Sequence, residues 1–149
     1  MSLQDRFGVN VNLLLFGICL GSEFGLSLSR EDVSSAERVV ARWQVHVVNT
    51  LRDVRRFLKA TGPSTDPLRR QIKSAELAAE RIETAMLAEW YLALRPEGPR
   101  GDRNTAIICN CRSVLAHYGA GQTELPQWLV KRALARKAPT SRALPAVNR

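Results

Sequence analysis

The chain has 149 residues, of which 45% are hydrophobic, so it can bury the core of one domain and is not disordered as a whole. Twenty-two Lys and Arg residues against fourteen Asp and Glu residues give a net charge of +8. This charge favours acidic partners such as nucleic acid, anionic lipid or an acidic protein surface. The chain has three cysteines, an odd number that fits no disulfide framework, so we expect a reducing, cytoplasmic setting.

The first strong signal in the chain is the apolar segment Val11–Leu20, which has no polar side beyond Asn12. The segment is about half as long as a membrane-spanning helix, so we predict a helix buried in a protein core and no membrane span. Asp5 precedes the segment and no small-residue cleavage site follows it, which argues against a signal peptide. We expect Gly21–Gly25 to form the turn after this helix.

The middle of the chain predicts two long helices joined by a short loop. The first starts near Ser29 or Ser34, and the spacing of Ser34 and Glu37 fits a capping box. Its apolar residues recur at steps of three or four: Val40, Trp43, Val47, Leu51, Val54 and Leu58. Asp66 followed by Pro67 is a helix-start signal, and a second stripe follows it: Leu68, Ile72, Ala75, Ala79, Ile82, Met86 and Ala93. The short loop predicts an antiparallel hairpin of Ala36–Lys59 and Pro67–Leu94.

The last part of the chain predicts two further helices and a tail. Asp102 can cap a helix over Arg103–Tyr118, and a short helix follows from Thr123. We therefore predict an all-α, single-domain helical bundle around a buried apolar helix, with residues 1–136 as the helical domain and residues 137–149 as a basic flexible tail. The predicted core consists of Leu14, Phe16, Ile18, Trp43, Val47, Leu51, Ile72 and Ile82.

Three blocks of the sequence carry a family resemblance. The first runs from Leu3 to Phe16. The second contains Trp43, Val47, Val48, Leu51, Arg52, Arg55, Arg56 and Leu58, and the third contains Lys73, Glu76, Leu77, Glu80 and Arg81. Together, and with gaps to about Tyr118, they resemble a proteobacterial family of small uncharacterised proteins. Members of the family usually have an acidic residue before Val-Asn, and this chain has Asn10 at that position. The resemblance implies an all-helical, cytoplasmic bacterial protein and assigns no activity.

Three glutamates, Glu76, Glu80 and Glu83, line one stripe of the second long helix. Paired carboxylates can bind metal, but helical di-iron sites use Glu-x-x-His, and neither His46 nor His117 belongs to such a motif. An ion-paired helix face is therefore the favoured interpretation. Folding about Pro63 places Arg52 near Glu76 and His46 near Glu80. The candidate polar cluster consists of His46, Lys73, Glu76 and Glu80.

Cations gather at two places. Arg52, Arg55, Arg56 and Lys59 form a basic edge at the end of the first long helix, and they are the candidate anion-binding or partner-binding residues. The alternative is a solvated face neutralised partly by Asp53 and the glutamates. The segment 128–137 carries four cations and no acid, which is typical of a nucleic-acid or membrane-surface arm or of a solubilising tail.

The sequence predicts no cofactor and no metal. Cys109 and Cys111 are two residues apart and point to different faces of a helix, so they do not form half of a zinc site. We expect a regulatory or adaptor protein that is not an enzyme and acts through an unknown protein partner. The alternative is a weak, non-specific nucleic-acid binder, and the third hypothesis is a helical enzyme using Glu76 and Glu80. A homo-oligomer remains open.

Overall fold

The helix α2 (Val11–Phe24) begins at a side-chain cap and ends at a glycine in the left-handed region. A computed structural model describes residues 7–94 and 100–121. The Asn10 side chain accepts hydrogen bonds from the backbone N–H groups of Asn12 and Leu13, and Gly25 follows the helix with φ of 61°. The turn predicted over Gly21–Gly25 therefore begins too early, because Gly21 is still part of the helix. Its missing side chain lets another helix approach: a Cβ there would lie 2.7 Å from the backbone nitrogen of Ile107.

The predicted antiparallel hairpin is present, and its first arm is longer than expected. This arm runs through α3 (Arg30–Trp43), a π-helix (Gln44–Asn49) and α4 (Thr50–Thr61). It starts with a capping box of Ser29 and Asp32, so the box expected at Ser34 is wrong. A 3₁₀ turn (Pro63–Thr65) then leads into α5 (Asp66–Leu94), which forms the second arm.

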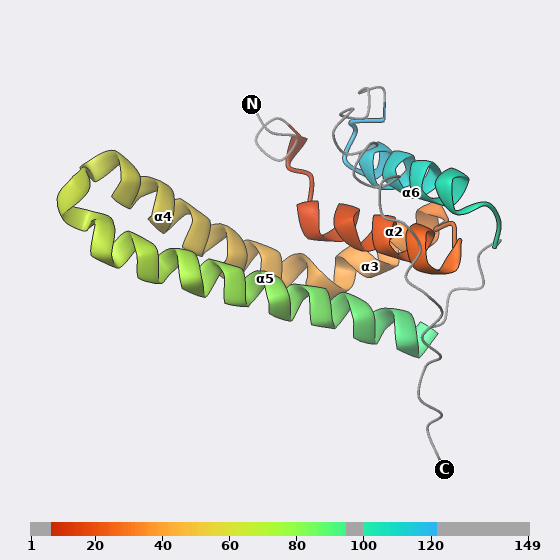
Figure 1. Cartoon of the computed structure of the whole chain (residues 1–149), viewed down its shortest axis with the longest axis horizontal. Coiled ribbons are helices and arrows are strands. Elements are labelled where there is room, and N and C mark those ends of the chain that lie inside the picture. Colours follow the sequence, from red (N-terminus) through yellow and green to blue (C-terminus); the bar gives the residue numbers. More distant parts are fainter. Residues whose placement is uncertain (1–6, 95–99, 122–149) are drawn as a thin grey trace, which may run out of the picture.

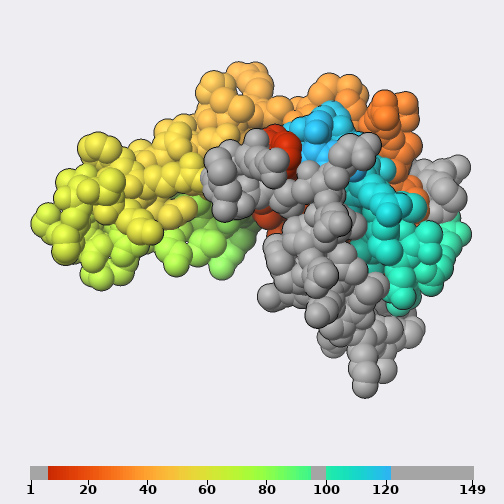
Figure 2. All heavy atoms as spheres, turned by 90° about the horizontal axis from the view of Figure 1, so that it is seen from above, coloured from red at the N-terminus to blue at the C-terminus, as the bar shows by residue number. Residues whose placement is uncertain are grey.

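The body of the molecule combines α2, α3 and the second half of α5 with one further helix, α6 (Arg103–His117). Helix α6 is capped by Asp102, as predicted. Helix α2 packs on α6 and α5, while α3 packs on α5 and α6, so the hairpin forms one layer and the α2–α6 pair forms a second. Helix α4 and the first half of α5 extend beyond the second layer as a projecting arm (Figures 1 and 2).

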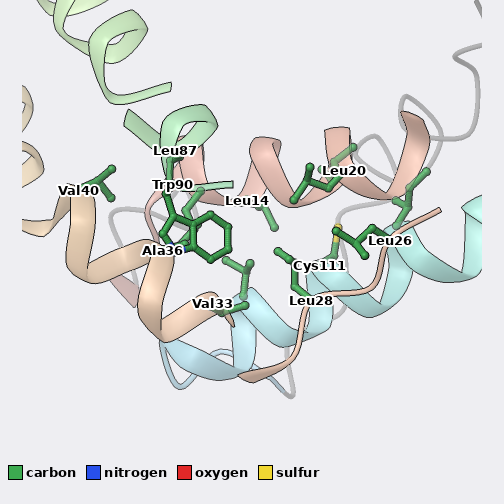
Figure 3. Packing of buried hydrophobic residues seen from close by; sticks show 14 residues of the cluster. Leu14, Leu20, Leu26, Leu28, Val33, Ala36, Val40, Leu87, Trp90 and Cys111 are labelled. Atoms are coloured by element: carbon green, nitrogen blue, oxygen red, sulfur yellow. The ribbon is translucent and has the colours of Figure 1, made fainter. Parts of the chain in front are cut away.

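The hydrophobic core lies between these four helices (Figure 3). It combines Leu14 and Leu20 of α2, Val33 and Ala36 of α3, Leu87 and Trp90 of α5, and Cys111 and Val114 of α6. Burying one such leucine or valine side chain contributes about 1.5–3 kcal/mol. A buried polar residue of α6, Asn110, links this helix to α2 and to the segment after α2. Its amide nitrogen donates to the carbonyls of Gly17 and Leu26, and its side-chain oxygen accepts from the backbone N–H of Leu28.

The predicted core is correct in part. Leu14 and Ile18 are buried, and Phe16, Trp43, Val47, Leu51 and Ile72 are half-buried. The prediction for Ile82 is wrong. This side chain is exposed, because α5 turns Glu76 and Glu83 toward the opposite arm of the hairpin instead. On the opposite arm Val48 is fully buried next to half-buried Val47, since the π-helix shifts the helical phase by one residue. Helix α2 is also less enclosed than expected, with Val11, Leu15 and Cys19 exposed along one side.

The protein is thus all-α, and its single domain is consistent with the predicted helical bundle. Within residues 7–94 and 100–121 the backbone forms no strand, although Leu26 and Arg100 make one isolated antiparallel bridge. None of the helices in these two ranges is long and apolar enough to cross a membrane. The proposed boundary at residue 136, the basic tail and the helix expected from Thr123 lie outside the described residues.

Candidate functional site

A row of charged and amide side chains is enclosed between the two arms of the hairpin and the start of α2. We call it the polar seam; it consists of Arg52, Arg55, Glu76, Glu80 and Glu83 together with Asn10 and Asn12. The helical phase of α5 turns Glu76, Ala79 and Glu83 toward the opposite arm, so that Glu76 and Glu83 are buried. Charged groups are rarely buried unless they are paired, so each carboxylate needs partners within the fold.

The half of the seam nearer the tip is an ion-pair network. Arg52 Nε lies 3.1 Å from Glu76 Oε1, and Arg52 Nη2 lies 2.9 Å from Glu80 Oε1. Arg55 donates to both carboxylate oxygens of Glu76 through Nε and Nη2. Burial alone would raise the pKa of Glu76, but hydrogen bonds from Arg55 and Arg52 outweigh it and the pKa lies below its ordinary value. The hydrogen bonding between Arg55 and Glu76 also raises the pKa of Arg55 above its ordinary value.

The half of the seam nearer the body is an amide cage around one carboxyl group. Asn10 Nδ2 and Asn12 Nδ2 each donate to a different oxygen of Glu83, both at 2.6 Å. The Glu83 side chain is fully buried, and this burial raises its pKa above the ordinary value despite the two donated hydrogen bonds. The cage therefore links the N-terminus of α2 to the middle of α5.

A family comparison covers this part of the chain. The family described as "Protein of unknown function (DUF2390)" matches residues 1–87.

The chain belongs to this family.

The DUF2390 match includes every residue of the polar seam and ends before α6, so the resemblance predicted to reach Tyr118 is confirmed to residue 87 only. Neither the curated proteins nor the solved structures give a significant match to the chain. Membership in the family therefore carries no activity to the polar seam.

Within the DUF2390 region the predicted site residues separate into two groups. The Arg52–Glu76 ion pair expected from the hairpin register is confirmed. His46 and Lys73 are exposed, and the structure does not bring them into the buried seam. Glu80 takes Arg52 as its partner where His46 was expected.

The four candidate anion-binding residues are also divided. Arg52 and Arg55 turn inward, and their charges are balanced by Glu76 and Glu80. Arg56 is half exposed, 3.9 Å from Asp53, and Lys59 is exposed. An anion bound on the surface would therefore meet Arg56 and Lys59 first, and the anion-binding role stays a prediction.

The chemistry of the seam is that of arginine–glutamate ion pairs. In the part of the chain that the structure describes, no three Asp, Glu, His or Cys side chains gather as a metal would require. Both carboxylates proposed for catalysis, Glu76 and Glu80, accept hydrogen bonds from arginine. The two helical cysteines do point apart, as predicted: Cys109 is exposed and Cys111 is buried, where burial raises the thiol pKa to about 11.

Sequence reasoning missed the roles of Asn10 and Asn12, which read as polar interruptions of an apolar segment. A usable signal was present, because an asparagine directly before an apolar helix is typical of an N-cap. A cap explains the side-chain oxygen of Asn10 but not its amide, and only the position of α5 shows that the amide meets Glu83. Asn110 was missed for the same reason, since its three partners lie 82 or more residues away.

The projecting arm has two unlike edges. Arg55 and Glu76 face each other across the hairpin, so residues just after each of them lie on one edge and residues just before lie on the other. The first we call the basic edge; its exposed residues include Arg56, Lys59, Arg70, Lys73, Leu77 and Arg81. The basic edge lies on the same side of α5 as the contact with α2. This follows because Tyr91, the residue just after the buried Trp90, stacks on Phe24 of α2. The opposite edge is covered by neither α2 nor α6.

Proposed function

We propose that this protein is a non-enzymatic regulatory or adaptor protein, and that its basic edge binds an acidic surface of a protein partner. The projecting arm supports this proposal, because the arm lies beyond the α2–α6 layer and its cations are exposed (Figures 1 and 2). Complementary charge steers such a partner to the arm and sets its orientation.

The observation that carries the proposal is the position of Leu77. This leucine is 47% exposed and lies one helical turn from Lys73 on one side and one turn from Arg81 on the other. An apolar side chain among cations fits a protein surface that offers an apolar contact surrounded by carboxylates. A phosphate backbone would use the cations and gain nothing from the leucine.

The proposed setting is the cytoplasm of a bacterium. The thiols of Cys109 and Cys111 support a reducing compartment. The bacterial assignment rests on the resemblance of the sequence blocks described above.

The test compares proteins retained from a lysate by the intact chain and by three variants. Leu77→Asp and the double variant Lys73→Glu/Arg81→Glu should each lose the same retained partner. The control Arg38→Glu makes the same charge change on exposed α3, away from the arm, and should keep it. The partner is then titrated in purified form, and binding that is unchanged by Leu77→Asp and by the double variant would remove the basic edge from the proposal.

The alternative function is weak, non-specific nucleic-acid binding through the same cations. The observation that favours it is the concentration of exposed Arg and Lys on one edge, with few acids among them. Its dissociation constant would be about 10⁻⁴–10⁻⁶ M at physiological salt and would rise steeply with salt concentration. Leu77→Ala separates the two functions, because it weakens binding to a protein partner and leaves a gel-shift titration with duplex DNA or RNA unchanged.

An enzyme acting through Glu76 and Glu80 is the third candidate. Its support is the pair of carboxylates on one helix face. The arginine hydrogen bonds to both residues make it the weakest of the three.

A further inference from the structure

We propose that two copies of this chain pair through the edge of the hairpin that lies opposite the basic edge. We call this surface the open edge. On α4 it is formed by Thr50, Val54, Phe57 and Thr61, and on α5 by Leu68, Gln71, Ala75, Ala78, Ile82 and Ala85. All ten side chains are exposed.

The open edge has the spacing of a helix-packing seam. Its residues on α5 recur at alternating steps of three and four, and those on α4 at steps of four, three and four. The two stripes lie side by side, because Val54 directly precedes Arg55 and Ala75 directly precedes Glu76, the residues that face each other across the hairpin. The indole of Trp43, which donates to the carbonyl of Ala79, marks the same edge closer to the body.

Large apolar side chains on this edge remain in contact with water. The exposed fractions are 70% for Phe57, 49% for Leu68 and 48% for Ile82. Exposed apolar residues are ordinary when they are scattered singly, but here they lie along one surface of two adjacent helices. Alanines on the same stripe, Ala75, Ala78 and Ala85, leave room for a facing helix to approach closely.

The charge distribution favours a second copy as the occupant. The chain carries a net charge of +8, yet none of the ten open-edge residues is Asp, Glu, Lys or Arg. Two copies that meet through this surface therefore bring no cations together, whereas contact through the basic edge would. An acidic partner gains no ion pair here, so the open edge is suited to its own uncharged counterpart.

The size of the surface is also adequate for a dimer. From Leu68 to Ala85 the α5 stripe rises about 26 Å, and two helices side by side are about 20 Å wide. An outline of this size covers about 500 Å² per copy, or about 1,000 Å² for two copies, which is the lower limit for a specific protein interface. Two hairpins packed through it would form a second four-helix bundle, with the α2–α6 layers on its outer sides.

The experiment measures the mass of the full chain in solution by analytical ultracentrifugation. The expected result is a dimer of twice 16.6 kDa that persists at about 1 M salt, where the Debye length is only about 3 Å. Ile82→Glu and Phe57→Glu should each raise the dimer dissociation constant about tenfold or more, because each places a charge in the apolar contact. Far-UV circular dichroism should stay unchanged, since both side chains are exposed.

The matched control is Leu77→Glu. Leu77 is on the same helix as Ile82 and is equally exposed, at 47% against 48%, but it lies on the basic edge. This variant should keep the dimer while losing the partner bound in the proposed function. The inference is overturned if the intact chain is monomeric at about 100 μM. It is equally overturned if Leu77→Glu dissociates the dimer as strongly as Ile82→Glu does.

Discussion

Asn10 and Glu83 are 73 residues apart and share a buried hydrogen bond, in which Asn10 Nδ2 donates to Glu83 Oε1 at 2.6 Å. The oxygen of the same Asn10 side chain accepts the backbone N–H groups of Asn12 and Leu13. One amide group therefore both caps α2 and fixes the start of α2 against α5. This double use makes Asn10 the link between the α2–α6 layer and the hairpin.

Replacing Asn10 should consequently cost more than the loss of a helix cap. Asn10→Ala removes a cap worth about 1 kcal/mol and also leaves a buried oxygen of Glu83 without its donor, which costs about a further 1–3 kcal/mol. Asn12→Ala removes a donor to Glu83 but no cap, so it should cost less. Urea denaturation of both variants measures the difference. Equal losses in the two variants would show that the cap contributes nothing.

The buried carboxyl group of Glu83 should make stability depend on pH. Its pKa in the folded protein is raised above the ordinary 4.5, because burial disfavours the charged form. A raised folded-state pKa means that the contribution of Glu83 is fully present below about pH 4.5 and is lost as the pH rises through the folded-state value. Glu83→Gln cannot ionise and lacks this loss.

The measurement is the difference in unfolding free energy between Glu83→Gln and the intact chain from about pH 4 to about pH 8. We expect the difference to move in favour of the variant as the pH rises. The opposite trend of Glu76, whose pKa is lowered, is common to both proteins and cancels in the subtraction. A difference that is constant across this range would contradict burial of an ionisable Glu83.

The ion-pair network should respond to charge reversal in an asymmetric way. Arg52→Glu places a third carboxylate beside Glu76 and Glu80 in a largely buried site, and we expect a loss of about 3–5 kcal/mol. Adding Glu76→Arg should restore only part of it, because the new cation lies beside Arg55. Arg56→Glu is the control: its pair with Asp53 is exposed, so the change should stay within about 1 kcal/mol. Full recovery in the double variant would show that Arg55 and Glu80 are not part of the network.

Two glycines of α2 offer a matched test of the contact with α6. A Cβ at Gly21 would lie 2.7 Å from the backbone nitrogen of Ile107, which cannot move without shifting α6. Gly21→Ala should therefore cost about 1–3 kcal/mol, despite the higher helix propensity of alanine. At Gly17 the nearest atom is the Asn110 Cβ at 3.4 Å, so Gly17→Ala should be nearly neutral. Thermal unfolding of both variants decides, and equal effects would contradict the tight crossing at Gly21.

The sequence by itself determined the helices and their order. Local signals were sufficient for this: the Asp102 side chain caps α6 by accepting from a backbone group a few residues away, and the Asp66–Pro67 pair lies where α5 begins. The apolar periodicity together with the short loop also predicted the hairpin and its Arg52–Glu76 pair. These features depend on neighbours in sequence or on the simplest antiparallel register.

The tertiary structure alone decided which face of each helix is buried. The pattern of apolar residues on α5 predicted that Ala75 and Ile82 face inward, but the helix is turned by one residue and buries Glu76 and Glu83. Burying a carboxylate is favourable only when its partners are in place, and those partners lie on α4 and at the start of α2. A hydrophobicity pattern records the cost of burial and not the distant groups that offset it. The same rotation leaves Ile82 in water, and with it the open edge of the hairpin.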